Sequence, residues 1–375
     1  MSLDLKCTFP VQSCSYPIRI AVGAMDVLHK ALFDLNFQNR AIALISDDAV
    51  AGLYAEKLLN ILRQSGFKVQ LFTFPRGESS KTRSEKERLE DQLFTAGYGS
   101  DSVVVALGGG VATDLAGYLA ATFCRGIPLI LMPTSLLAMV DASIGGKVGV
   151  NVPFGKNMLG TIFQPKMVLI DPSTLLTLPQ KEIKNGFVEM IKHGLIADEH
   201  YFSFLEAEAE GLIGLNSALM QKAIYLSCRI KKEIVEQDEK EAGKRRILNF
   251  GHTIGHALET LTDYTLSHGE AIAIGILVES YLAVMLGFLD PRLLERTHDL
   301  LKRYGLPLKL PGKISFKSLY EAMTRDKKAL NQVPRFVLLG QIGSVLDFNN
   351  CYCKAVDDKS LKQACDWMND DLCSH

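Results

Sequence analysis

Three histidines lie close together in the sequence, and their spacing is suited to binding a metal ion. His252 and His256 are four residues apart in a helix-compatible stretch, so both imidazoles would project from one helical face. His268 follows a turn-like Thr-Asp-Tyr-Thr segment and returns a third imidazole. A catalytic zinc site uses three such protein ligands and keeps one position open. The alternative is that they are ordinary polar residues, since most histidine pairs at this spacing bind no metal.

A carboxylate that could complete this site occurs in an earlier apolar segment. Glu189 lies in a helical stretch that is otherwise apolar on the same face, and Lys192 follows one turn later. A carboxylate in such a position is either exposed or paired with a cation. Glu189 could therefore supply the oxygen ligand of a two-histidine, one-carboxylate metal site.

A glycine-rich turn points to a bound anion. Residues 108–114 read Gly-Gly-Gly-Val-Ala-Thr-Asp, follow a predicted buried strand and open a helix. Backbone N–H groups at such a helix start bind a pyrophosphate. Thr113 stands where the usual dinucleotide fingerprint has its third glycine. The alternative interpretation is a tight turn that requires small residues.

Two further segments contain charged residues that could bind an anionic ligand or the substrate. Lys147, Lys156 and Asn157 lie among glycines, which predicts a loop system that binds phosphate or carboxylate; the alternative is two solvated surface loops. The run of mixed charge from Arg229 to Arg246 is typical of a solvated helix face. Because it leads directly into the histidines, substrate binding is plausible for some of its members.

The elements that must position these residues alternate between strand and helix in the first half of the chain. Such alternation predicts a parallel sheet with helices on both sides. Helices are expected at residues 53–65, at 81–96 and from the glycine turn to 123. The predicted strands are residues 18–22, 41–45, 69–74, 103–107, 128–132 and 167–170.

The second half has helical periodicity in almost every window from residue 181 to about 305. We therefore predict an NAD-binding α/β domain over residues 1–175 and a helical metal- and substrate-binding domain over residues 176–375. The last sixty residues are mixed, with one strand expected at 335–339. The predicted helices of this half are residues 187–197, 201–209, 216–236, 253–260 and 271–285.

Composition describes an ordinary soluble globular protein and excludes several functions. The chain has 375 residues, 47% hydrophobic and 22% charged, with a net charge of −1. Without a basic excess, we expect no nucleic-acid or membrane partner. The longest apolar stretch, residues 127–140, is too short to span a bilayer, and the N-terminus lacks signal-peptide features. Eight scattered cysteines without a C-x-x-C motif indicate reduced thiols and a cytoplasmic location.

Taken together, the motifs resemble those of the 3-dehydroquinate synthase family, within the sugar phosphate cyclases. A weaker match occurs at Asp326-Lys327-Lys328. The resemblance implies a Rossmann-like domain followed by a mainly α-helical metal-binding domain. The matching motifs, in chain order, are G-E-S-S-K, A-L-G-G-G-V-A-T-D-L-A-G, R-G-I-P, V-D-A-S-I-G-G-K-V-G-V-N, G-K-N, V-E-M-I-K, D-E-K-E, L-N-F-G-H-T-I-G-H-A and L-S-H-G-E.

The resemblance also implies roles for individual residues. Zinc, or alternatively cobalt, would be held by Glu189, His252 and His268, while His256 would be a hydrogen-bonding group near the substrate. Arg125 would reach a phosphate in a neighbouring subunit, which implies a homodimer. NAD would be bound by Asp47, Glu78, Lys81, Gly109, Gly110, Val111, Asp114, Thr134, Ser135, Asp141, Lys147, Lys156, Thr174 and Thr177. The substrate would be surrounded by Lys147, Asn157, Lys192, Lys231, Glu241, Arg245, Asn249 and His256.

The reaction implied by the resemblance converts 3-deoxy-D-arabino-heptulosonate 7-phosphate into 3-dehydroquinate and phosphate. It proceeds by transient oxidation with NAD, phosphate elimination, reduction, ring opening and an intramolecular aldol closure. One alternative is another sugar phosphate cyclase such as 2-deoxy-scyllo-inosose synthase. A metal-dependent polyol dehydrogenase is more distant, and a non-enzymatic protein with this fold would be expected to have lost a metal ligand.

Overall fold

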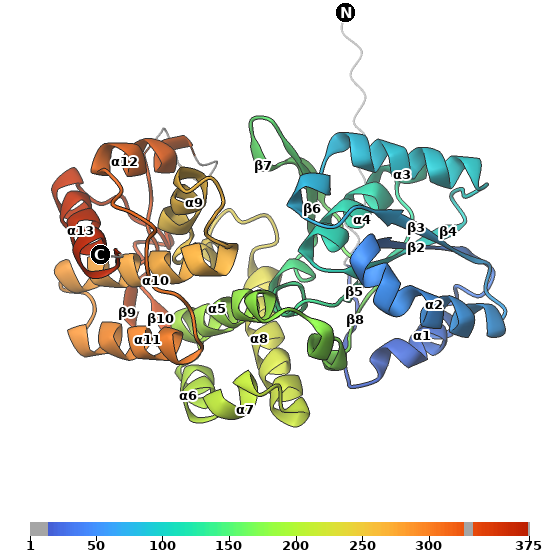
Figure 1. The fold of residues 1–375 in the computed structure, drawn as a ribbon, viewed down its shortest axis with the longest axis horizontal. Coiled ribbons are helices and arrows are strands. Elements are labelled where there is room, and N and C mark those ends of the chain that lie inside the picture. Colours follow the sequence, from blue (N-terminus) through green and yellow to red (C-terminus); the bar gives the residue numbers. More distant parts are fainter. Residues whose placement is uncertain (1–13, 326–332, 374–375) are drawn as a thin grey trace, which may run out of the picture.

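A computed structural model describes residues 14–325 and 333–373, so Asp326, Lys327 and Lys328 lie outside the described residues. Figure 1 shows a half built around a sheet beside a half built from helices. The predicted fold class is confirmed by this arrangement. The division at residues 175 and 176 stays a prediction, although the last strand of the sheet ends at Ile170 and the first long helix of the second half begins at Gln180.

Six parallel strands of the described chain form the main sheet, in the order β1-β8-β5-β4-β2-β3. The central strand β4 is buried along its whole length, because both faces of the sheet are covered. Val103 and Val105 belong to one hydrophobic core, and Val104 belongs to the other. The strands are β1 (Ile18–Ile20), β2 (Ala41–Asp47), β3 (Val69–Phe74), β4 (Ser102–Gly108), β5 (Leu129–Pro133) and β8 (Met167–Ile170).

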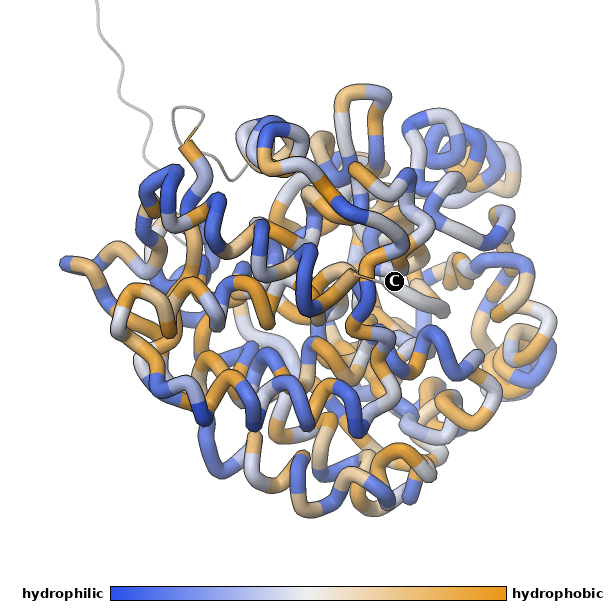
Figure 2. Tube along the Cα trace, turned by 60° about the vertical axis from the view of Figure 1, so that its left-hand side comes forward, coloured by the Kyte–Doolittle hydropathy of each residue, from blue (hydrophilic) through white to orange (hydrophobic). Residues whose placement is uncertain are grey.

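Helices cover the two faces of this sheet as the alternating pattern predicted. The hydrophobic core shared with α1 (Leu28–Asp34) and α2 (Asp48–Gln64) lies on one face, and the core shared with α3 (Arg83–Thr95) and α4 (Gly110–Thr122) lies on the other. Hydrophilic and hydrophobic residues alternate along the outer parts of the chain in Figure 2, as expected for amphipathic helices. Helix α2 begins before the predicted residue 53, because the Asp47 carboxylate caps it by accepting the Val50 N–H at 3.0 Å.

The segment predicted to be a loop system is instead an antiparallel hairpin, so that prediction was wrong. Strands β6 (Lys147–Val152) and β7 (Gly155–Ile162) pair with each other, and the hairpin projects between the two halves (Figure 1). Its strands approach so closely at Gly160 that an added Cβ would lie 2.1 Å from the Val148 carbonyl oxygen. These glycines are required for the close approach of the two strands. The prediction took the same glycines as a sign of loops.

The second half is helical, as predicted, but its predicted strand is displaced. Residues 335–338 are not part of a strand; β9 (Leu339–Gln341) begins where the prediction ends and pairs with β10 (Ser344–Val345). The helices are α5 (Gln180–Ala197), α6 (Glu199–Ala207), α7 (Ala209–Ile213), α8 (Ser217–Gln237), α9 (His252–Leu261), α10 (His268–Met285), α11 (Pro291–Arg303), α12 (Phe316–Arg325) and α13 (Asp358–Asp371).

Helix α10 is the apolar centre of this half, and α9 packs directly on its backbone. Among the described helices, α10 alone is long and apolar enough to cross a membrane, but 72% of that window is buried inside the fold, as in a core helix. A Cβ added at Gly275 would lie 1.9 Å from the Gly251 carbonyl oxygen. This contact sets the spacing between the start of α9, which carries His252, and α10, which begins with His268.

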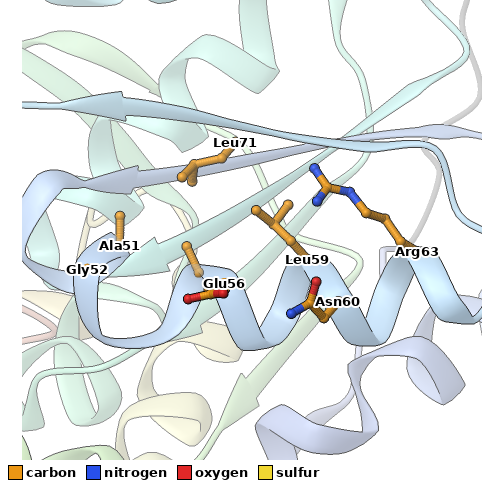
Figure 3. A pocket seen from close by; sticks show the side chains of 8 residues that line it. Ala51, Gly52, Glu56, Leu59, Asn60, Arg63 and Leu71 are labelled. Atoms are coloured by element: carbon orange, nitrogen blue, oxygen red, sulfur yellow. The ribbon is translucent and has the colours of Figure 1, made fainter.

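The contact between α9 and α10 predicts a strong effect of one methyl group. Gly275→Ala should cost about 1–3 kcal/mol or more, because the methyl group would meet backbone that cannot move aside. Gly52→Ala is the matched control, since nothing lies within 4 Å of an added Cβ on this exposed face of α2 (Figure 3). The control should be stabilised by up to about 1 kcal/mol. Thermal unfolding measures both, and equal midpoints for the two variants would contradict the prediction.

Candidate active site

Three of the predicted ligands meet between helices of the second half. Glu189 comes from the middle of α5, while His252 and His268 are the first residues of α9 and α10. Their potential ligand atoms all lie within 4.8 Å of one another. Nε2 of His252 is 3.5 Å from Glu189 Oε1, and Nε2 of His268 is 3.6 Å from the same oxygen. The expectation that a turn returns His268 toward His252 is confirmed by this geometry.

The other nitrogen of each imidazole faces an acceptor. Nδ1 of His252 lies 3.0 Å from the Phe250 carbonyl oxygen, and Nδ1 of His268 lies 3.7 Å from Glu259 Oε1. An acceptor at Nδ1 favours the tautomer that keeps the proton there, which leaves the Nε2 lone pair for a metal. Both imidazoles are therefore oriented as metal ligands usually are.

A second group of possible ligands overlaps the first at His268. It consists of His256, Glu259 and His268, also within 4.8 Å of one another. Glu189 distinguishes the two groups, because it is fully buried and faces the Lys192 ammonium and the imidazoles of His252 and His268. A buried carboxylate of this kind requires a cation. The residues Glu189, His252 and His268 thus fit a divalent ion better.

Charges around the three ligands favour a cation as well. Burial alone would raise the pKa of Glu189, but Lys192 and His268 outweigh it and lower that pKa to about 2. Burial would lower the pKa of His268, but hydrogen bonds to Glu189 and Glu259 raise it to about 9. The two carboxylates that favour a proton on His268 would equally favour a bound metal ion.

A partly buried ion pair lies next to this group. Lys231 of α8 donates to Asp141 Oδ1 at 2.6 Å, and Asp141 belongs to a short π-helix, Ala138–Ala142. Burial opposes ionisation of Asp141, but Lys231 outweighs it and holds the pKa of that carboxyl well below its usual range. Burial lowers the pKa of Lys231, against the attraction of Asp141. The resemblance assigned Asp141 to NAD and Lys231 to the substrate, and their pairing was not predicted.

Arg245, another predicted substrate contact, is fixed by backbone acceptors. Its side chain is buried, and Nη1 and Nη2 each donate to the Gly145 carbonyl oxygen at 3.2 Å. A Cβ on Gly145 would lie 2.4 Å from Nη2, so the guanidinium needs glycine at this position. Nearby, Glu241 accepts from Asn249 at 2.7 Å and pairs with Lys147 of β6. Arg245, Lys147 and Asn249 are thereby held as donors between the hairpin and the helical half.

The predicted cofactor residues gather where the parallel strands end, as expected for a doubly wound sheet. Asp47 ends β2, and Thr134 and Ser135 directly follow β5. A Cβ added at Gly109 would lie 3.3 Å from Ser135 Oγ. A Cβ added at Gly108 would lie 3.2 Å from Asp47 Oδ2. Gly110 and Val111 open α4 at the same edge. The glycine turn is therefore enclosed by the residues predicted to bind NAD.

Other members of the predicted cofactor set interact with one another. Buried Lys81 pairs with Asp114 of α4. Burial would lower the pKa of Lys81, but Asp114 outweighs it and raises that pKa. Glu78 accepts from Asn151 of β6 at 2.8 Å. The hydroxyls of Thr174 and Thr177 form hydrogen bonds within the sheet half. Thr174 donates to the Thr134 carbonyl oxygen at 3.4 Å, and Thr177 bonds to the Tyr54 hydroxyl.

Three more of the predicted residues lie on the hairpin or beyond the end of α4. Arg125 is exposed just beyond the C-terminal end of α4, whereas the glycine turn lies at the opposite end of that helix. Lys156 of β7 contacts the helical half, with Nζ 3.5 Å from Glu259 Oε1 and 3.9 Å from the Tyr264 ring centroid. The backbone N–H of Asn157 donates to Asn151 Oδ1 at 2.9 Å within the hairpin. Within a single chain, Arg125 does not join the site.

Glu259 is a site residue that the sequence reasoning missed. It is buried on α9 between His268 and Lys156. Burial would raise the pKa of Glu259, but His268 outweighs it and lowers that pKa to about 2. Its position three residues after His256 places it on the same helical face, which was the available signal.

A separate groove of about 330 Å³ lies on the outer surface of α2, against Leu71 of β3 (Figure 3). Glu56, Asn60 and Arg63 line it together with apolar residues of α2. None of the predicted site residues lines this groove, so it is not part of the candidate active site.

Family models match the chain in two consecutive parts. The model of the 3-dehydroquinate synthase N-terminal part matches residues 71–185, and that of the C-terminal part matches residues 186–329. The 3-dehydroquinate synthase of Desulforamulus reducens is 43% identical over 88% of this chain and 92% of its own length. That of Pelobacter propionicus is 42% identical over 89% of this chain and 93% of its own.

Solved structures of related cyclases share the fold. A 2-epi-5-epi-valiolone synthase from Streptomyces hygroscopicus subsp. jinggangensis, with NAD+ and Zn2+ bound, has a TM-score of 0.85 and 26% identity, covering 97% of this chain and 99% of its own. A 2-deoxy-scyllo-inosose synthase complexed with carbaglucose-6-phosphate, NAD+ and Co2+ has a TM-score of 0.81 and 25% identity. The match covers 93% of this chain and 95% of that protein.

The position of Glu259 predicts a specific loss. Glu259→Gln should weaken Zn2+ binding about 10- to 100-fold, because the neutral amide oxygen accepts the Nδ1–H of His268 more weakly than the carboxylate and carries no negative charge. Competition with a chromophoric chelator measures the affinity without substrate or NAD. Glu56→Gln, on the exposed face of α2, is the control and should match the parent. Parental zinc affinity in Glu259→Gln would rule out this role for the carboxylate.

Proposed function

The chain belongs to the 3-dehydroquinate synthase family, and from that premise we propose that it converts 3-deoxy-D-arabino-heptulosonate 7-phosphate into 3-dehydroquinate and phosphate. The observation that carries the proposal is a group of metal-ligand side chains bordered by buried cations. Glu189, His252 and His268 form the group, and Lys192 and Lys231 lie beside it. A substrate with both a carboxylate and a phosphate requires cations of this kind.

The residues present fit both cofactors that this reaction needs. Glu189, His252 and His268 would hold one divalent ion, zinc or cobalt, which supplies Lewis-acid polarisation of a substrate oxygen. NAD, bound at the glycine turn between β4 and α4, supplies reversible hydride transfer. The enclosure of Gly109 by Ser135 and the helix start at Gly110 support a pyrophosphate at that turn.

The remaining residues would bind and orient the substrate. Arg245 keeps a fixed orientation through its bonds to Gly145, so its guanidinium can hold an anionic group without reorganising. Lys147 is paired with Glu241, which is also held by Asn249, so an incoming anion would compete with that carboxylate. Lys192, Lys231, Asn157 and His256 would complete the substrate-binding set, with His256 donating or accepting a hydrogen bond rather than binding metal.

The exposed position of Arg125 supports an oligomer. Since Arg125 lies beyond the far end of α4, it could contact a bound phosphate only in another subunit. We propose a homodimer, in a cytoplasmic enzyme without a nucleic-acid or membrane partner. Sedimentation of the purified protein would test the dimer, and a monomer at micromolar concentration would contradict it.

A second candidate is another sugar phosphate cyclase. The two solved cyclases share the fold and hold NAD+ and a divalent metal, which favours this class as the alternative. Their identities of 25% and 26% are lower than the 43% of a 3-dehydroquinate synthase relative, which supports the heptulosonate as substrate.

The proposed function predicts phosphate release with two requirements. The purified protein should release phosphate from 3-deoxy-D-arabino-heptulosonate 7-phosphate with catalytic amounts of NAD and without accumulating NADH. Chelation should abolish release, and zinc should restore it, because the metal ligands are needed for the reaction. Phosphate and 3-dehydroquinate are measured together. Steady NADH formation from a simple polyol without phosphate release would assign the chain to a dehydrogenase instead.

A further inference from the structure

A buried histidine lies one helical turn beyond Glu189 and has so far been given no role. His193 of α5 is fully buried, and its Nδ1 lies 2.7 Å from the Ser227 hydroxyl of α8, which is also buried. Burial and the adjacent Lys192 ammonium lower the pKa of His193 to about 3. The imidazole is therefore neutral at physiological pH, with a proton on one nitrogen only.

The ring of His193 lies close to two carboxylates. In the described part of the chain, Nε2 is buried and has no hydrogen-bond partner. A ring nitrogen of His193 and carboxylate oxygens of Asp141 and Glu189 all lie within 4.8 Å of one another. Ionised carboxylates only accept hydrogen bonds, so a neutral ring beside them must present an N–H. The favoured tautomer thus carries its proton on Nε2 and accepts the Ser227 hydroxyl proton at Nδ1.

Of the two carboxylates, Glu189 is the more deeply buried. Asp141 Oδ1 already accepts from Lys231 at 2.6 Å. Glu189 Oε2 forms an ion pair with Lys192, whereas Oε1 lies 3.5 Å and 3.6 Å from Nε2 of His252 and of His268. One water molecule could bridge a gap of up to 4.8 Å between His193 and Glu189, and such a bridge serves nearly as well as a direct hydrogen bond.

We propose that His193, held by Ser227, is a positioning residue that orients Glu189 for the divalent metal. The inference rests on the metal site of the proposed function. Ser227 fixes the tautomer of His193, and the Nε2–H directs one oxygen of Glu189, so that the other points toward His252 and His268. Metal-ligating carboxylates generally depend on such a donor behind them.

Three variants test the proposal by zinc affinity, measured with a chromophoric chelator in the absence of substrate. His193→Leu fills the space but has no donor, so its affinity should fall about 10- to 100-fold. His193→Gln retains an N–H that can reach the same carboxylate, and it should recover most of that loss. Ser227→Ala keeps the imidazole but frees its tautomer, and it should show an intermediate loss. His200→Gln, an exposed histidine of α6, controls for adventitious zinc binding.

The outcomes separate positioning from packing. Zinc affinity in His193→Leu within about twofold of the parent, at an unchanged circular dichroism spectrum, would overturn the proposal, since a carboxylate-orienting donor is worth more than that. Equal losses in His193→Gln and His193→Leu would also overturn it, because they would indicate packing alone. If His193→Leu does not fold, Ser227→Ala decides: parental affinity there overturns the proposal. A parent that binds zinc but forms no 3-dehydroquinate would contradict the proposed function only.

Discussion

A single buried negative charge organises the helical half of the molecule. Glu189 is fully inside the protein, where an unpaired carboxylate would cost several kcal/mol by itself. Lys192 on the same helix, His252 at the start of α9 and His268 at the start of α10 surround it. Each belongs to a different turn or element, so α5, α9 and α10 must keep a fixed arrangement around the charge.

Charge neutralisation extends outward from this centre in pairs. Lys231 is neutralised by Asp141, Lys147 by Glu241 and Lys81 by Asp114. Such pairs contribute little net stability, because desolvation offsets the attraction of the buried ions and solvent screens the exposed Lys147. They do hold cationic side chains in one geometry before a ligand arrives, which reduces the reorganisation that binding requires.

The sequence was sufficient for the features that depend on local patterns. Continuous apolar runs identified β4 and β8 correctly, because strands buried on both faces have no polar alternation. The histidine spacing nominated His252, His256 and His268, and their ring centroids lie 5.3 to 6.2 Å apart. The hairpin of β6 and β7 was missed because its glycines are required by close backbone pairing, which composition does not distinguish from a loop. Glu259 and His193 were missed because their roles depend on partners from other helices, Lys156 and Ser227.

The hairpin is attached to both halves of the molecule at once. Asn151 bonds to Glu78 in the sheet half, while Lys147 and Lys156 reach Glu241 and Glu259 in the helical half. An isolated two-stranded hairpin is marginally stable in water, so its order depends on these attachments. If the two halves moved apart, these attachments would break, and we expect the pairing of β6 with β7 to weaken first. The order of the hairpin therefore depends on the distance between the cofactor turn and the metal ligands.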